Sequence, residues 1–471
     1  MLAGSMVKTD IFESDHIGSA VWKLALPTVV SQLITTIYNL ADTFFVGKTG
    51  DELQLAALSI VFPTQLALTA VGNLFGIGAG NCISKALGAK DAARARAASR
   101  FAIWCGSAFT LLLSLAVFFF ETPFLGLLGS TEELNAPASS YLWWVVVLGA
   151  VPAVFNMILA GMLRGEGRSF HAGLGLSLGG VLNILLDPFF VLPFGLGWEI
   201  RGAAIATFLS NLATTLYFAI LCFCTRKRSV ISFVPRVWSA AKETGADVLL
   251  TGIPSALQTM LSAVSNLALN SLMIAHGAEA EAAIGVTKKI DAIPFGLITG
   301  ISQGAAPLIA YHRGAANREK MQRSLRVAMC YCVGVGLAIL AVVEISAPWL
   351  VGIFAGGNAL VLKDGTGFLR LHCIAVPFAA VTYMLVSFFQ AAGAKLRAFL
   401  LSIIRKGMLD IPLMFLMDGI YPKYGIVACQ PITDCFSALC GVMFFVFWWR
   451  RTKKLSPPAA TCGGADRLRR G

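Results

Sequence analysis

The chain has 471 residues, of which 57% are hydrophobic and only 13% are charged. A soluble protein of this length could not bury so much apolar surface, so the composition excludes that class and indicates an integral membrane protein. The formal net charge of +12 does not point to nucleic acid, because the basic residues are distributed as membrane topology requires. Eleven cysteines show no metal-type spacing and imply no disulfide framework.

Twelve apolar runs of bilayer-spanning length follow one another along the chain. They predict transmembrane helices at 20–46, 53–80, 97–119, 139–163, 170–192, 200–224, 245–275, 282–311, 323–346, 366–390, 397–418 and 424–449. The predicted fold class is therefore an all-α integral membrane protein with twelve transmembrane helices.

Basic residues gather in one set of alternate loops, chiefly within 85–100, 226–242, 313–326 and 395–406. The opposite loops hold most of the acidic residues and only five basic ones: Lys48, Arg201, Lys363, Arg370 and Lys423. Because cytoplasmic loops carry the excess of lysine and arginine, both termini are predicted to lie in the cytoplasm.

The two halves of the chain resemble each other on either side of a long polar connection. Leu24–Ala41 is similar to Leu250–Ala268, and Gly78–Ala95 is similar to Gly304–Met321. Two six-helix repeats in the same orientation are related by a pseudo-two-fold axis along the membrane normal, and transporters bind substrates at such interfaces. The predicted organisation is an N-terminal six-helix lobe at 1–224, a cytoplasmic linker at 225–244, a C-terminal six-helix lobe at 245–450 and a cytoplasmic tail at 451–471.

Polar residues interrupt the first and fifth apolar runs. Asn183 and Asp187 are four residues apart and share one helix face, and Pro188 frees a backbone carbonyl nearby. Asp42 follows Asn39 by three residues, so both can face one side of the first helix. An ionisable residue inside a span indicates a functional site, with a buried ion pair as the alternative. Two carboxylates brought together there can hold one proton or ligate Na⁺, and both ions stay open.

Other polar residues in the spans have a structural alternative to a binding role. Lys288, Lys289 and Asp291 could contact substrate or form an internal ion pair. Asp410 is predicted to pair with Arg405 or Lys406, and the role of Asp434 is open. No ligand spacing is found for His276, His312 and His372. The candidate substrate contacts, each with packing as its alternative, are Gln32, Tyr38, Gln258 and Met260.

Several motifs together resemble the multidrug and toxic compound extrusion (MATE) family. The resemblance covers roughly Val21 to Trp449 and is closest to the branch named after DNA-damage-inducible protein F. It rests on NLADTFFVG (Asn39–Gly47), GIGAGNCISKALGAKD (Gly76–Asp91), RGEGR (Arg164–Arg168), NILLDP (Asn183–Pro188), GAAIAT (Gly202–Thr207), GISQGAAPLIAYHRGA (Gly300–Ala315) and QAAGAK (Gln390–Lys395).

This resemblance implies a V-shaped exporter made of two bundles, with a cation site in the amino-terminal lobe. The family residues of that site correspond to Asp42, Asn183, Asp187 and Thr207, with Asn39 beside them, and the first three would ligate Na⁺ if that is the coupling ion. Some members use carboxylates in spans seven and ten instead. Here Thr251–Ala275 and Leu371–Gln390 contain neither Asp nor Glu, which argues against that second site.

The predicted function is an antiporter, driven by H⁺ or Na⁺, that exports organic and often cationic drugs by alternating access. The alternative is a lipid-linked oligosaccharide flippase of the same superfamily, but flippases usually need a basic cavity, whereas the mid-span charges of spans one to seven are acidic. No metal or nucleophile motif supports an enzyme. The predicted partners are small organic cations and membrane lipids, without nucleic acid or cofactor. The chain is predicted to be a monomer in the cytoplasmic (inner) membrane of a prokaryote.

Overall fold

The computed structural model describes residues 10–193 and 195–455, which are helical apart from short connections and contain no strand. The first half comprises α1 (Asp10–Glu13), α2 (Ile17–Gly47), α3 (Glu52–Gly88), α4 (Ala92–Phe119), α5 (Glu121–Leu127), α6 (Glu132–Leu142), η1 (Trp143–Leu148), α7 (Ala150–Gly165), α8 (Ser169–Val191) and α9 (Glu199–Thr225). The connection contains η2 (Arg226–Arg228), α10 (Val237–Ala240) and η3 (Ala241–Gly245). The second half comprises α11 (Ala246–Ile274), α12 (Ala278–Gly314), α13 (Arg318–Gly352), α14 (Ala359–Cys373), α15 (Ala375–Ala391), α16 (Lys395–Ile403), η4 (Ile404–Met408), α17 (Asp410–Ile420) and α18 (Tyr424–Leu455).

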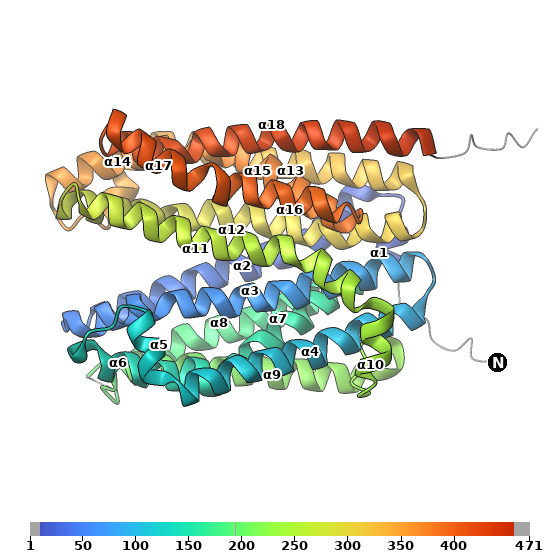
Figure 1. Cartoon of the computed structure of the whole chain (residues 1–471), viewed down its shortest axis with the longest axis horizontal. Coiled ribbons are helices and arrows are strands. Elements are labelled where there is room, and N and C mark those ends of the chain that lie inside the picture. Colours follow the sequence, from blue (N-terminus) through green and yellow to red (C-terminus); the bar gives the residue numbers. More distant parts are fainter. Residues whose placement is uncertain (1–9, 194, 456–471) are drawn as a thin grey trace, which may run out of the picture.

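The helices form two bundles that lie side by side, with both described chain ends at the same end of the molecule (Figure 1). We call α2–α9 the N-terminal lobe and α11–α18 the C-terminal lobe. The main contacts between the lobes are made by α2 and α3 of the N-terminal lobe with α11 and α12 of the C-terminal lobe.

Among the described residues, ten helices are long and apolar enough to cross a bilayer. An eleventh span forms if the pair 132–148 and 150–165, bent by 48°, is one crossing. The remaining predicted run, 397–418, corresponds to α16, η4 and α17, which are individually too short because a π-helical segment separates them. The all-helical membrane fold is confirmed, and the predicted eleventh span, 397–418, is an interrupted helix rather than a continuous one.

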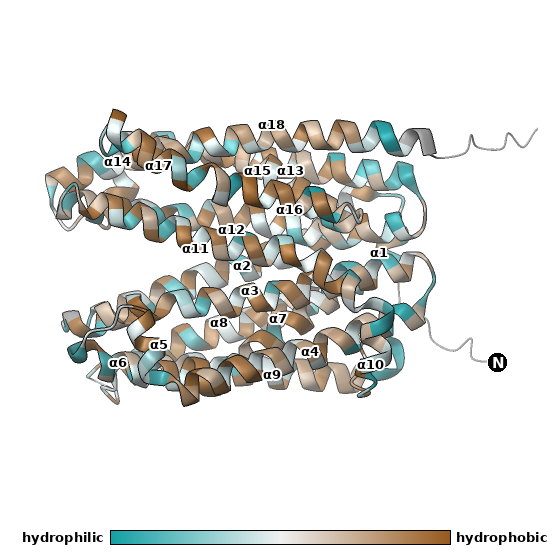
Figure 2. Ribbon diagram, in the orientation of Figure 1, coloured by the Kyte–Doolittle hydropathy of each residue, from teal (hydrophilic) through white to brown (hydrophobic). Residues whose placement is uncertain are grey.

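Apolar side chains cover much of the outside of the bundles. Phe119, Leu127 and Ile345 are 70%, 83% and 84% exposed. Figure 2 shows hydrophilic residues gathered mainly at the two ends of the helices and hydrophobic residues along their middle parts. This surface suits hydrocarbon, because lipid tails solvate the side chains that water would exclude.

The lobes touch closely near the end of the molecule that carries the chain termini. A Cβ atom at Gly88 of α3 would lie 2.0 Å from the carbonyl oxygen of Tyr311 of α12. At Gly314 it would lie 1.9 Å from the carbonyl oxygen of Lys85. Ser84 donates a hydrogen bond of 2.6 Å to the carbonyl of Pro307. Only glycine allows the two backbones to approach so closely. The glycines at these positions therefore let the two lobes pack together on this side.

Candidate functional site: a cation site on an interlobe cavity

A cavity of about 550 Å³ lies between the two lobes. The N-terminal lobe lines it with polar residues that include Gln32, Asn39, Asp42, Gln65, Asn183 and Thr207. The C-terminal lobe lines it with polar residues that include Ser255, Gln258, Thr259, Gln303, Tyr383 and Gln390. Amide and hydroxyl groups set among apolar residues suit an amphipathic organic ligand.

Asp42 of α2 and Asp187 of α8 meet in the N-terminal lobe, where they are 5% and 0% exposed. The Asp42 carboxyl interacts with the side chains of both Asp187 and Asn183. Asn183 Nδ2 donates to Asp187 Oδ1 at 3.4 Å and to Thr207 Oγ1 at 3.3 Å. α8 continues through Pro188 to Val191, so the spacing of four residues does place Asn183 and Asp187 on one face.

Three buried oxygen atoms of this cluster have no hydrogen-bond partner: Asp42 Oδ1, Asn183 Oδ1 and Asp187 Oδ2. Buried polar atoms are normally paired, so unpaired acceptors mark a place for a donor or a cation. Carboxylate and amide oxygens suit both a proton and Na⁺. No group of three His, Cys, Asp or Glu able to hold a metal is found in the described part of the chain, so an ion here would also rely on amide and hydroxyl oxygen.

The other residues predicted from the sequence have different positions. Asn39, Tyr38, Gln32 and Gln258 line the cavity, as Asp42, Asn183 and Thr207 do. Asp187 is not among the lining residues and lies behind them. Met260 does not line the cavity and is 42% exposed, because it lies on a face of α11 turned away from it.

Two residues near the carboxylates were not predicted. Tyr141 of α6 is 1% exposed and lies close enough to Asp42 and Asp187 to feel their charge. Its hydroxyl accepts a hydrogen bond from Gln65 of α3. Both are single polar residues inside apolar runs, and that is the only signal that could have identified them.

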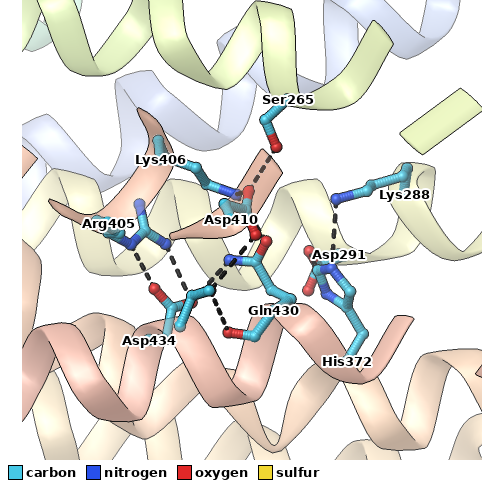
Figure 3. A network of polar contacts seen from close by, with 10 residues as sticks. Ser265, Lys288, Asp291, His372, Arg405, Lys406, Asp410, Gln430 and Asp434 are labelled. Carbon is cyan, nitrogen blue, oxygen red and sulfur yellow. Dashed lines mark hydrogen bonds and ion pairs between the residues drawn. The ribbon is translucent and has the colours of Figure 1, made fainter. Parts of the chain in front are cut away.

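The C-terminal lobe contains a second group of buried charges (Figure 3). Lys406 Nζ lies 2.9 Å from Asp410 Oδ2, which confirms one of the two predicted partners of Asp410. Arg405 pairs with Asp434 instead. Lys288 does not pair with Asp291 directly, because His372 lies between them. None of these acids lies on spans seven or ten, in agreement with the departure noted in the sequence.

Comparison with known proteins identifies the family. The MatE family model matches residues 27–189 and 254–416, one segment in each lobe. The chain belongs to the MatE family. It is therefore a transporter and not an enzyme.

MatE relatives match this protein over almost its whole length. It is 28% identical over 432 residues to the multidrug export protein MepA of Staphylococcus saprophyticus, covering 92% of this chain and 94% of the relative. MepA of Staphylococcus aureus strain NCTC 8325 matches with the same identity and coverage. A solved structure described as the outward-facing conformation of a multidrug resistance MATE family transporter superposes with a TM-score of 0.86 at 25% identity, covering 96% of this chain and 100% of the other.

Proposed function

We propose that this MatE protein exports organic cations in exchange for inward movement of H⁺ or Na⁺. The observation that carries the proposal is the set of three unpartnered oxygen atoms of Asp42, Asn183 and Asp187 beside the interlobe cavity. A cation bound there would offset one of the two negative charges of the neighbouring carboxylates, and an organic cation in the cavity would compete for the same charge. The name of MepA as a multidrug export protein supports the export of drugs.

Alternating access would use the contacts described above. In the state described here the lobes are held together near the chain termini, through Ser84, Gly88 and Gly314. With both termini in the cytoplasm, this is the closed inner side, and the cavity faces outward. The likeness to the outward-facing structure supports the same assignment. The relation to the branch of DNA-damage-inducible protein F stays a prediction.

The test is efflux of a fluorescent lipophilic cation from proteoliposomes under separately imposed Na⁺ and H⁺ gradients. We expect one gradient to drive efflux and an anion of equal size to be carried poorly, because Asp42 and Asp187 repel it. Efflux that follows neither gradient would contradict coupling. Movement of lipid-linked sugars without cation efflux would instead favour a flippase.

A further inference from the structure

The C-terminal lobe encloses a polar network that the proposed coupling site does not use (Figure 3). Arg405 forms an ion pair with Asp434, and Lys406 forms one with Asp410. Gln430 joins the pairs, since it accepts from Lys406 Nζ at 2.6 Å and donates to Asp434 Oδ2 at 2.7 Å. Ser265 of α11 donates to Asp410. All four charged groups therefore have direct partners of opposite charge.

A neighbouring part of the network is built differently. Lys288 Nζ lies 3.2 Å from His372 Nε2, and His372 Nδ1 lies 3.0 Å from Asp291 Oδ2. Lys288 and Asp291 belong to α12, whereas His372 belongs to α14. His372 and Asp291 are 2% and 4% exposed. Lys288, His372 and Asp291 thus form a row of contacting side chains, with two basic groups and one carboxylate at its end.

The donors and acceptors of this chain allow a single proton between the two basic groups. An ammonium can only donate, so a charged Lys288 requires Nε2 of His372 to be an acceptor. A doubly protonated His372 would direct an N–H at Lys288, which must then be neutral. In either case His372 Nδ1 lies 3.0 Å from Asp291 Oδ2, close enough for the carboxylate charge to stabilise the cation, although Nδ1 makes no hydrogen bond in the state described here.

The charges of the network balance only when that proton is present. Arg405, Lys406 and the shared proton supply three positive charges, against the three negative charges of Asp291, Asp410 and Asp434. Loss of the proton leaves one uncompensated negative charge in a low-dielectric site. Asp291 Oδ1 is already buried without a hydrogen-bond partner, so its carboxylate is the least satisfied of the three.

We propose that Lys288 and His372 share one exchangeable proton, held by Asp291, and so form a second proton-binding site in the C-terminal lobe. A metal ion fits poorly there, because Lys288 directs a positive charge at His372, and the proton is the cation that such a chain accepts. The charged groups that face it from adjacent elements are Lys406 of η4, Asp410 of α17 and Asp434 of α18. Glu344 of α13 is occupied by Arg370.

Aromatic rings connect this site to the interlobe cavity. Phe295 lies against His372 and against Tyr383, with ring centroids 6.4 Å and 6.2 Å apart. Tyr383 lines the cavity and also stacks on Arg405, whose guanidinium carbon is 4.5 Å from the ring centroid. A cation bound beside Tyr383 would offset the negative charge left by proton loss. This consequence, unlike the proton site itself, rests on the proposed function.

The test is the ¹⁵N NMR spectrum of the histidine side chains in the detergent-solubilised full chain, followed from about pH 5 to about pH 10. We expect a His372 signal, assigned by its loss in His372→Asn, to move in one step as the shared proton leaves, because Nε2 then loses either its own proton or the hydrogen bond from the Lys288 ammonium. Asp291→Asn should shift this step to lower pH by about one unit or more, because the stabilising charge is gone. Lys288→Met should raise the pH at which His372 becomes doubly protonated.

His312 is the matched control, since it is also 2% exposed and lies on the same helix, α12, at its other end from Lys288 and Asp291. Its signal should be unmoved by Asp291→Asn. A wild-type His372 signal that stays constant over the whole range would overturn the proposal and show a fixed structural contact. That result needs no variant to fold. A step unaffected by both Asp291→Asn and Lys288→Met would overturn it as well.

Transport does not enter this measurement, so the proton site and the proposed export can fail separately. Absence of cation efflux together with a pH-dependent His372 signal would contradict only the proposed export. Coupled efflux together with a constant His372 signal would contradict only the proposed second proton site. In the double variant Asp42→Asn, Asp187→Asn, which keeps His372, binding of tetraphenylphosphonium should still release protons, as measured with a pH dye. Adding His372→Asn to this double variant should abolish the release.

Discussion

At the scale of single residues, the central question is whether Asp42 and Asp187 share one ion. Their side chains interact, and each leaves one oxygen atom without a partner. Replacing either with Asn removes the exchangeable charge at almost constant shape. We expect ion-driven efflux to fall at least about tenfold in each single variant and hardly further in the double variant, because residues that act as a unit give non-additive losses.

The measurement is coupled efflux at matched expression for the wild type and the three variants. Glu132→Gln is the control, because Glu132 is an exposed carboxylate at the start of α6. The thermal stability of the two Asn variants should be unchanged or higher, since a buried charge is removed. Losses that multiply in the double variant would mean two separate roles, and full activity in either single variant would end the shared-site mechanism.

Glu166, in the connection between α7 and α8, is a second residue for which the structure predicts a measurable effect, the dependence of stability on pH. It is fully buried, and its Oε1 accepts hydrogen bonds of 2.6 Å from Ser229 Oγ and from the backbone N–H of Val230. Burial raises the pKa of this carboxyl, against the hydrogen bonds and Arg168, which lower it. The folded state therefore holds the proton more tightly than the unfolded chain does.

The sign of the pH effect follows from this raised pKa. The contribution of Glu166 to stability is greatest at low pH and declines as the pH rises through the raised pKa, where the buried carboxylate must ionise. Glu166→Gln keeps an acceptor for Ser229 and Val230 and should flatten this part of the stability profile. Melting temperatures of both proteins between about pH 5 and about pH 8 check it, with Glu133→Gln as control. Parallel profiles would contradict the assignment.

At the scale of elements, α1 acts as a small bridge between the lobes. Phe12 is fully buried and stacks on Tyr311 of α12, with ring centroids 4.9 Å apart. On its other side it adjoins Gly167 of the N-terminal lobe, where an added Cβ would lie 3.1 Å from the ring. Lys320 of α13 fixes the following turn through an ion pair of 2.6 Å with Asp15. The segment thus stabilises the closed side.

Phe12→Ala should favour opening of that side. Truncation of a fully buried phenylalanine costs about 3 kcal/mol, and this cost falls only on the state in which both lobes meet α1. In a cysteine-free background, Ser84→Cys should then react faster with a maleimide, since Ser84 is buried where the lobes touch. Phe119→Ala, in an exposed ring of α4, is the control. Equal labelling rates in both variants would show that α1 does not hold the closure.

At the scale of the whole molecule, the orientation in the membrane is open to direct measurement. The basic loops and both described chain ends lie on the side where the lobes are closed. We expect a reporter fused after Arg451 to be cytoplasmic and a cysteine at Glu132 to react with an impermeant label from outside. Labelling in the opposite sense would reverse the orientation and the direction of export with it.

The sequence predicted more of the fold than of the N-terminal site. Hydropathy and loop charge are properties of short segments, so the spans and their alternation could be derived without tertiary information. The interruption at η4 was not predicted, although Arg405, Lys406, Gly407 and Asp410 break the apolar run 397–418 at that point, because such residues also occur inside continuous helices. Asn183 and Asp187 were joined by helical periodicity alone, whereas their meeting with Asp42 was inferred from family resemblance and not from spacing.

What the sequence determined by itself is the membrane class, the two repeats and the polar faces of single helices, because each depends on residues close together in the chain. Only the tertiary structure decided which of those faces meet. Lys288 and His372 are separated by 84 positions and carry no motif, so their contact was invisible until α12 and α14 packed together. A buried charge is costly wherever it occurs, but its partner, and hence its role, is set by the packing of helices that lie far apart in the sequence.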